Sequence, residues 1–272
     1  MSLSDVTRQL ATIAGGSSLL VLGPTSDFGG DADAYLSPAV PASPTFAIWG
    51  PLFLGNLATL ALQTSLRERQ DSVLKRIAWP LAVARGGTGL WSRVFALGHL
   101  PASLALIGTT WGAAALAYSR LPDPTVASAR DRWLVSAPTG ALFGWLTVAA
   151  VTAKTELLLD PRDEVVPGDV QPLGPAVGVD PTRLAVAAIT GTGVLAAAVT
   201  AGADRTLAFP AAVAWGLGGI VARQADQRPV VAAAATGALL GLGAAAVIAL
   251  ARRRSARRVE RARREVIDAI EA

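Results

Sequence analysis

The chain has 272 residues, of which 52% are hydrophobic and 16% are charged, and its formal net charge is +4. Soluble domains usually carry about 25% charged residues, so this composition argues against an ordinary soluble domain. The chain has no cysteine, which excludes disulfides and thiolate metal sites, and its single histidine, His99, leaves little room for imidazole chemistry.

Apolar segments close to 20 residues long recur along the chain. About 20 helical residues, each rising about 1.5 Å, cross the roughly 30 Å hydrocarbon core of a bilayer. The sequence therefore predicts an all-α, polytopic membrane helix bundle with about eight transmembrane helices. The expected spans are residues 6–22, 44–66, 77–98, 101–119, 133–157, 183–201, 207–221 and 229–250.

The connections divide the chain into four parts. Residues 1–158 form a five-helix membrane domain, and residues 159–182 form an outer loop rich in proline and acidic residues. Residues 183–251 add three further membrane helices, and residues 252–272 form a basic cytoplasmic tail. The first span lacks a clear cleavage site, so we expect it to be a retained helix.

Basic residues gather in the loops after the second and fourth spans and in the tail. Because short basic loops stay in the cytoplasm, we expect a multi-pass protein of the inner (plasma) membrane with both termini cytoplasmic. The basic tail is typical of contact with anionic lipid, and we expect no nucleic-acid partner.

Four tryptophans lie deep in their spans, in the outer half of the membrane: Trp49, Trp91, Trp111 and Trp145. A buried indole needs a hydrogen-bond partner or a ligand. The residues alone leave a ligand pocket and plain packing open as alternatives. Three further aromatic residues at span ends are typical of an interfacial belt, namely Trp79, Trp133 and Tyr118.

Two arginines, Arg85 and Arg93, lie inside the third span. A charge near mid-membrane costs about 2.5–3.5 kcal/mol on insertion scales and usually faces a partner or water. Arg85 or Arg93 is a candidate counter-charge for a ligand carboxylate. Alternatively, these arginines pair within the protein, for which Glu156 is the best acidic candidate, or extend to an interface. Lys154 and Glu156 are two residues apart and do not face each other, so we interpret them as interface residues.

Three segments, in order and at matching spacing, resemble motifs of the TspO/MBR family, the tryptophan-rich sensory proteins related to the translocator protein. They contain Phe46, Trp49, Leu52 and Phe53; then Trp91, Ser92 and Phe95, followed by His99, Pro101, Ala102, Leu104 and Trp111; and finally Trp145 and Ala149. The chain departs from the family where Thr88 and Ala153 replace two asparagines and Phe53 replaces the usual tyrosine. The resemblance covers residues 1–158, and the last three spans are similar to the extension of larger bacterial relatives.

The resemblance implies a pocket among the first five helices that binds porphyrins or sterols and is closed by the loop of residues 23–43. It implies no catalytic residue and no metal ligand. The implied ligand-binding residues are Phe46, Trp49, Phe53, Arg85, Thr88, Trp91, Trp111 and Trp145. The bound group would be a tetrapyrrole or another apolar molecule.

We therefore expect a membrane receptor or carrier for a tetrapyrrole-like or sterol-like molecule. The alternative is a structural accessory subunit of another membrane complex, without ligand transport. A porphyrin-degrading enzyme is a third hypothesis, which the scarcity of histidine, cysteine and tyrosine disfavours. The partners are the lipid bilayer and the small molecule, and a homodimer is left open. Gly237 and Gly241 form a close-packing motif that could serve the chain itself or such a dimer.

Overall fold

The computed structural model describes residues 3–22, 37–65, 71–97, 99–159, 180–203 and 205–271. None of these residues forms a β-strand. The helices are α1 (Leu3–Leu22), the 3-10 helix η2 (Ser43–Ile48), α2 (Trp49–Thr64), α3 (Ser72–Ala96), α4 (Leu100–Ser119), the short α5 (Ala129–Asp131), the π-helical turn η3 (Arg132–Ser136), α6 (Ala137–Leu159), α7 (Pro181–Gly202), α8 (Ala208–Gln224) and α9 (Pro229–Glu271). The long helices coincide with the predicted spans, so the all-α class is confirmed.

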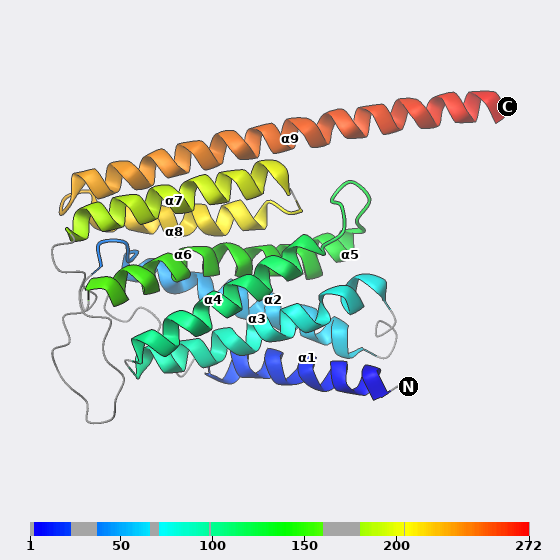
Figure 1. Cartoon of the computed structure of the whole chain (residues 1–272). Coiled ribbons are helices and arrows are strands. Elements are labelled where there is room, and N and C mark those ends of the chain that lie inside the picture. Colours follow the sequence, from blue (N-terminus) through cyan, green and yellow to red (C-terminus); the bar gives the residue numbers. More distant parts are fainter. Residues whose placement is uncertain are drawn as a thin grey trace.

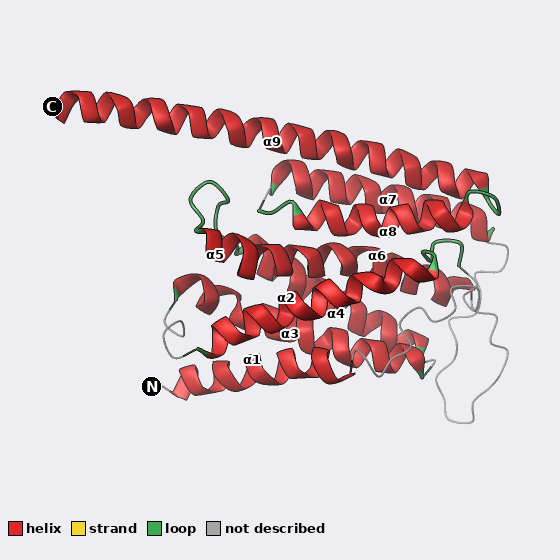
Figure 2. Ribbon diagram, turned by 180° about the vertical axis from the view of Figure 1, so that it is seen from behind, coloured by secondary structure: helices red, strands yellow, loops and turns green. Residues whose placement is uncertain are grey.

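The helices form two groups that share α6 as their common wall (Figure 1). In the first group, α1 packs on α3, α3 on α4 and α4 on α6, while α2 contacts α1 and α6. In the second group, α8 packs on α6, and α9 packs on α7 and α8. Both chain ends lie at the same end of the bundle, as the view from behind also shows (Figure 2).

Four stretches of the described residues are long and apolar enough to cross a membrane: Ser43–Thr64, Ala129–Glu156, Pro181–Gly202 and Pro229–Ala256. They belong to η2 with α2, to α5 through α6, to α7 and to α9. The other long helices run beside them in the same bundle (Figure 1). The chain is a membrane helix bundle, as predicted. The predicted outer loop lies largely outside the described residues.

Capping groups start two helices earlier than hydropathy alone predicts. The side chain of Asp71 accepts hydrogen bonds from the backbone nitrogens of Val73 at 2.8 Å and Leu74 at 3.0 Å. A carboxylate at this position satisfies N–H groups that have no partner inside the helix. Helix α3 therefore begins at Ser72, several residues before the predicted span, and Asp180 caps α7 in the same way.

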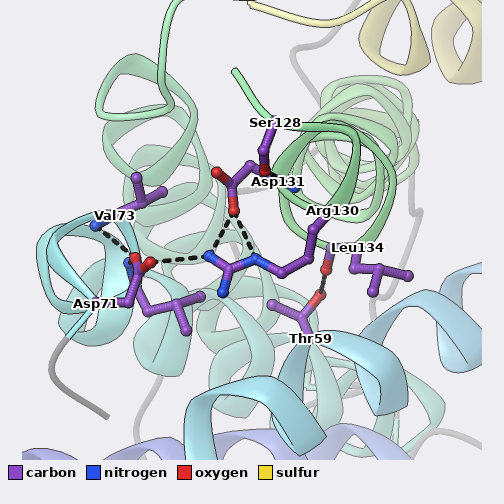
Figure 3. Close-up of polar contacts among 8 residues, drawn as sticks. Thr59, Asp71, Val73, Ser128, Arg130, Asp131 and Leu134 are labelled. Atoms are coloured by element: carbon purple, nitrogen blue, oxygen red, sulfur yellow. Dashed lines mark hydrogen bonds and ion pairs between the residues drawn. The ribbon is translucent and has the colours of Figure 1, made fainter. Parts of the chain in front are cut away.

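An ion-pair network joins α5 to the start of α3 (Figure 3). Nη2 of Arg130 lies 2.8 Å from Oδ2 of Asp71 and 2.7 Å from Oδ1 of Asp131. Close by, Oγ1 of Thr59 donates to the carbonyl of Leu134 at 2.7 Å. These contacts tie two connections and α2 together at the end of the bundle that holds the chain termini.

We expect the charge of Asp71 to make stability depend on acid. Partial burial acts to raise the pKa of Asp71, but hydrogen bonds from Leu74, Arg130 and Val73 outweigh it and lower the pKa. A carboxyl with a lowered folded-state pKa stabilises the fold above its unfolded pKa of about 3.9, and this contribution is lost as pH falls through the folded pKa.

Asp71→Asn keeps a good capping residue and removes the charge. The variant should be less stable than the wild type at neutral pH, by less than about 1 kcal/mol because the ion pair is partly exposed. It should also lose less stability on acidification, which thermal unfolding at several pH values measures. Identical pH profiles for the two proteins would contradict this prediction.

Glycines allow the closest helix contacts in each group. A Cβ added at Gly15 would meet the backbone of Ala82, and Oγ of Ser18 donates to the carbonyl of Gly86 at 3.2 Å, which joins α1 to α3. Between α6 and α8, a Cβ at Gly144 would meet the backbone of Phe209. Small residues at such crossings let helix backbones approach closely in a membrane.

The predicted close-packing motif on α9 makes no such contact. A Cβ at Gly237 or at Gly241 would meet no atom within 4 Å. Among the described residues the motif therefore forms no close helix contact, and for these residues the alternative of packing within the chain is wrong. A homodimer through this face stays a prediction.

An aromatic cluster joins the two helix groups near the chain-terminal end. Tyr118 of α4 lies 5.3 Å from Phe143 of α6 and 5.4 Å from Phe209 of α8, measured between ring centroids. Its hydroxyl accepts a hydrogen bond from the backbone of Arg205 at 3.2 Å. Tyr118 is 2% exposed, so its assignment to an interfacial belt is wrong, because the C-terminal helices cover it.

Helix α9 is longer than a bilayer crossing requires. Its 43 residues span about 65 Å at 1.5 Å per residue, and its C-terminal part projects beyond the other helices (Figure 1). Nη1 of Arg252 donates to the carbonyl of Ala201 at 2.8 Å, so the basic tail begins level with the end of α7.

Candidate functional site

A cavity of about 710 Å³ lies between α4, α6 and α7. Small-molecule sites in proteins usually measure about 300–1,000 Å³. The lining parts of α4, α6 and α7 belong to the half of the bundle remote from the chain ends (Figure 1), and residues of α7 line one side of the cavity. Its apolar surface includes Leu104, Ile107 and Gly108 of α4, Val151 and Leu158 of α6, and Leu184 and Leu195 of α7.

Trp111 lines this cavity and is held there by hydrogen bonds. Its Nε1 donates to Oγ1 of Thr147 at 3.0 Å, and that hydroxyl donates to the carbonyl of Phe143 at 2.8 Å. The indole also packs on the ring of Phe143, with centroids 5.9 Å apart. The fixed indole gives the cavity a rigid aromatic wall, and contact of Trp111 with a ligand stays a prediction.

The other hydroxyls on the cavity wall are bonded within the protein. Oγ1 of Thr192 donates to the carbonyl of Ala188 at 2.8 Å. Oγ1 of Thr155 lies 3.0 Å from the carbonyl of Val151 and 2.7 Å from Oγ of Ser37. Because these hydroxyls are already bonded, the wall offers a mainly apolar surface to a ligand.

The structure brings two of the four deep indoles together at another place. Trp49 of α2 and Trp145 of α6 are buried, with ring centroids 6.1 Å apart. Phe53 stacks on Trp49 at 5.6 Å, and Phe46 meets Trp145 edge-on at 5.7 Å. None of these four side chains lines the cavity between α4, α6 and α7, so their contact with a ligand stays a prediction.

Trp91 of α3 lies apart from both places. It is buried, and its ring centroid is 5.5 Å from that of Phe95. The indole nitrogens of Trp91 and Trp145 are buried without a hydrogen-bond partner among the described residues. Since a buried indole usually has such a partner, both residues remain candidates for ligand contact.

The sequence matches the family model described as TSPO-like protein over residues 24–248, which is most of the chain. The chain belongs to the TSPO-like protein family. The match includes α7, α8 and the first part of α9, up to residue 248, so the C-terminal helices lie within the region that the family model describes. Neither the curated proteins nor the solved structures that were compared contain a significant match.

In this TSPO-like protein the buried arginine does not serve the cavity. Arg85 is 2% exposed, and its Nη1 donates to Oε1 of Gln63 at 2.9 Å. Glu156, the acidic partner considered from the sequence, instead accepts a hydrogen bond from the backbone nitrogen of Ser37 at 2.9 Å. The suggested pairing of Arg85 with Glu156 is therefore wrong.

The space beside Arg85 is small. Asn56 and Thr139 help to line a void of about 10 Å³ there, which is room for about one water molecule. Thr88 on the same helix is also buried, and its Oγ1 donates to the carbonyl of Ala84 at 2.6 Å. Arg85 and Thr88 do not line the large cavity. Either side chain could contact a ligand in that cavity only if the helices around it moved.

The end of the predicted lid loop is anchored by both helix groups. Ser37 contacts Glu156 and Thr155 of α6, and the backbone nitrogen of Ala42 donates to the carbonyl of Gly219 of α8 at 3.0 Å. Since Thr155 also lines the cavity, the loop ends beside the cavity wall. Residues 23–36 of the loop lie outside the described residues.

The sequence did not predict the roles of two residues, one on the cavity wall and one that holds the segment before α2. Lys154 lines the cavity, whereas the sequence placed it at an interface; its seven-residue spacing from Thr147 is the signal that both share one helix face. Trp215 of α8 donates from Nε1 to the carbonyl of Thr45 at 2.6 Å. It fixes the segment before α2, and nothing in the sequence pairs it with that segment.

Metal chemistry finds no support in the part of the chain that the structure describes. No group of three or more histidine, aspartate or glutamate side chains there could hold a metal ion. His99 precedes α4 and is exposed.

Proposed function

We propose that this protein binds a tetrapyrrole-like or sterol-like molecule in the cavity between α4, α6 and α7, and acts as a receptor or carrier for it. The observation that carries the proposal is the cavity itself, whose volume suits a small molecule and whose hydroxyl groups are bonded within the protein. The rigid indole of Trp111 supplies a surface for stacking.

A binding titration tests this proposal. Protoporphyrin IX and cholesterol represent the two ligand classes, and the expected result is saturable binding of at least one at about micromolar concentration, about −8 kcal/mol. Trp111→Ala should weaken that binding about tenfold or more, since it removes both stacking surface and cavity wall. Absence of saturable binding for both probes would overturn the proposal.

One observation favours the accessory-subunit alternative. The C-terminal part of helix α9 projects beyond the other helices (Figure 1), and a Cβ added at Gly237 or Gly241 would meet no atom within 4 Å. Purification in mild detergent separates the alternatives, because stoichiometric co-purifying subunits favour the accessory role and a bound small molecule favours the receptor.

We also propose that both termini face the cytoplasm from the inner (plasma) membrane. The support is the distribution of charge, since Arg76, Arg120, Arg130 and Arg252 all lie at the end of the bundle that holds the termini. Basic residues near span ends stay on the cytoplasmic side.

A further inference from the structure

We infer that the ligand of the α4–α6–α7 cavity is a free amphiphilic acid whose anionic group is held by Lys154. This inference rests on the proposed function and adds the charge of the ligand and the residue that recognises it. It also gives the C-terminal extension a role, because residues of α7 line the same cavity as Lys154.

The first step is the distribution of charge around the cavity. Lys154 is the one charged side chain among the described residues that line it, and the lining hydroxyls of Thr147, Thr155 and Thr192 are bonded to protein oxygens. A ligand therefore meets an apolar wall with a single cation. Such a wall matches a molecule that has an apolar body and an anionic group.

The second step is that Lys154 has no hydrogen bond or ion pair among the described residues, whereas Glu156 and Asp180 at the same end of the bundle are already bonded within the protein. Glu156 accepts from the backbone of Ser37 at 2.9 Å. Asp180 accepts from the backbone of Thr182 at 2.9 Å and lies 3.6 Å from Nε of Arg183. A cation beside an apolar cavity gains from an anionic partner, and the ligand can supply it.

The third step is the position of Lys154 along the cavity. Lys154 follows Thr147 by seven residues, so it lies about 10 Å farther along the same face of α6. Trp111 is bonded to Thr147 and marks the deeper end. An amphiphile would place its apolar body against Trp111 and its acid group near Lys154, toward the end of α6.

The fourth step excludes the cations that the sequence offered for this role. Arg85 is buried beside a void of about 10 Å³, and Arg93 is exposed and does not line the cavity. The cavity volume is that of a small-molecule site, which favours a free acid over a two-chain phospholipid.

The test compares ligands that differ only in their acid groups. Protoporphyrin IX is paired with its dimethyl ester, and cholesteryl hemisuccinate is paired with cholesterol. Each pair is titrated into the wild type, Lys154→Gln, Lys154→Arg and the control Lys75→Gln, which changes a lysine at the opposite end of the bundle.

In at least one pair, the wild type should bind the acid about tenfold more tightly than the neutral ligand, because the neutral ligand cannot make the charge-assisted contact with Lys154. Lys154→Gln should abolish this preference without weakening the neutral partner. Lys154→Arg and Lys75→Gln should retain it, and added salt should reduce it.

Equal binding of acid and neutral partner to the wild type, or an unchanged preference in Lys154→Gln, would overturn the inference while leaving the proposed function intact. Failure of all four probes to bind the wild type would instead overturn the proposed function. Equally effective competition by phosphatidylglycerol would assign the cavity to a bilayer lipid and contradict the free acid.

Discussion

Gly144→Leu is expected to separate α8 from α6 and to destabilise the protein more than any surface substitution. A Cβ at this position would meet the carbonyl of Phe209 and the Cβ of Ala212. Because one obstacle is helix backbone, no side-chain rotation relieves the clash. Inserting a leucine there should cost about 3 kcal/mol or more.

The matched control is Gly237→Leu on α9. Both substitutions gain about 1 kcal/mol of helix propensity, but a Cβ at Gly237 meets no atom within 4 Å. Thermal unfolding in detergent should therefore show a large loss for Gly144→Leu and a small change or a gain for Gly237→Leu. Equal stability of the two variants would contradict the packing of the C-terminal helices on α6.

The same substitution should disturb the site. Helix α8 holds residues 42–45, before α2, through Gly219 and Trp215. A few residues earlier, Ser37 contacts Thr155 on the cavity wall. We expect Gly144→Leu to weaken binding of protoporphyrin IX or cholesterol as well as folding.

Gly108→Phe is expected to abolish ligand binding and to leave the fold intact. Gly108 lines the cavity, and a Cβ there would meet no atom within 4 Å. A phenylalanine can therefore enter the cavity without displacing backbone. It should occupy volume that the ligand needs and weaken binding about 100-fold or more, which corresponds to about 2.7 kcal/mol.

Gly112→Phe is the control for this substitution. Gly112 lies one turn farther along α4, does not line the cavity, and has equally open space around it. Both variants replace one glycine of α4 with phenylalanine, so a difference between their binding constants comes from the position of the phenylalanine relative to the cavity. Loss of binding in both variants, or in neither, would contradict the assignment of the ligand to this cavity.

The helices and their order were predictable because each span has a long apolar segment of its own. The capping carboxylate of Asp71 explains why α3 begins before the apolar segment does. The cytoplasmic assignment of the ends stays a prediction, although both ends share one side of the bundle.

The candidate site was only partly predictable. Trp111 lines a cavity that α7 also borders, whereas Trp49 and Trp145 pack against each other elsewhere. The difference arises because the position of a tryptophan in its span predicts its depth in the membrane, but not which neighbouring helix its side chain contacts. The wall from α7 and the role of Lys154 required contacts between segments far apart in the sequence, which periodicity alone does not supply.

Tyr118 illustrates the same limit. Its position at a span end is typical of an interfacial belt, and only the packing of α8 shows that it is buried against Phe143 and Phe209. Sequence patterns locate a residue along its own helix, whereas burial depends on which helix covers it.

The most direct test is the mass of the small molecule that stays bound after gentle extraction from the membrane, measured by native mass spectrometry. We expect the wild type and Gly112→Phe to carry one hydrophobic molecule with an acid group, and Gly108→Phe to lack it. A wild type that retains only bulk lipid, or a Gly108→Phe variant that retains the same molecule, would contradict a ligand site between α4, α6 and α7.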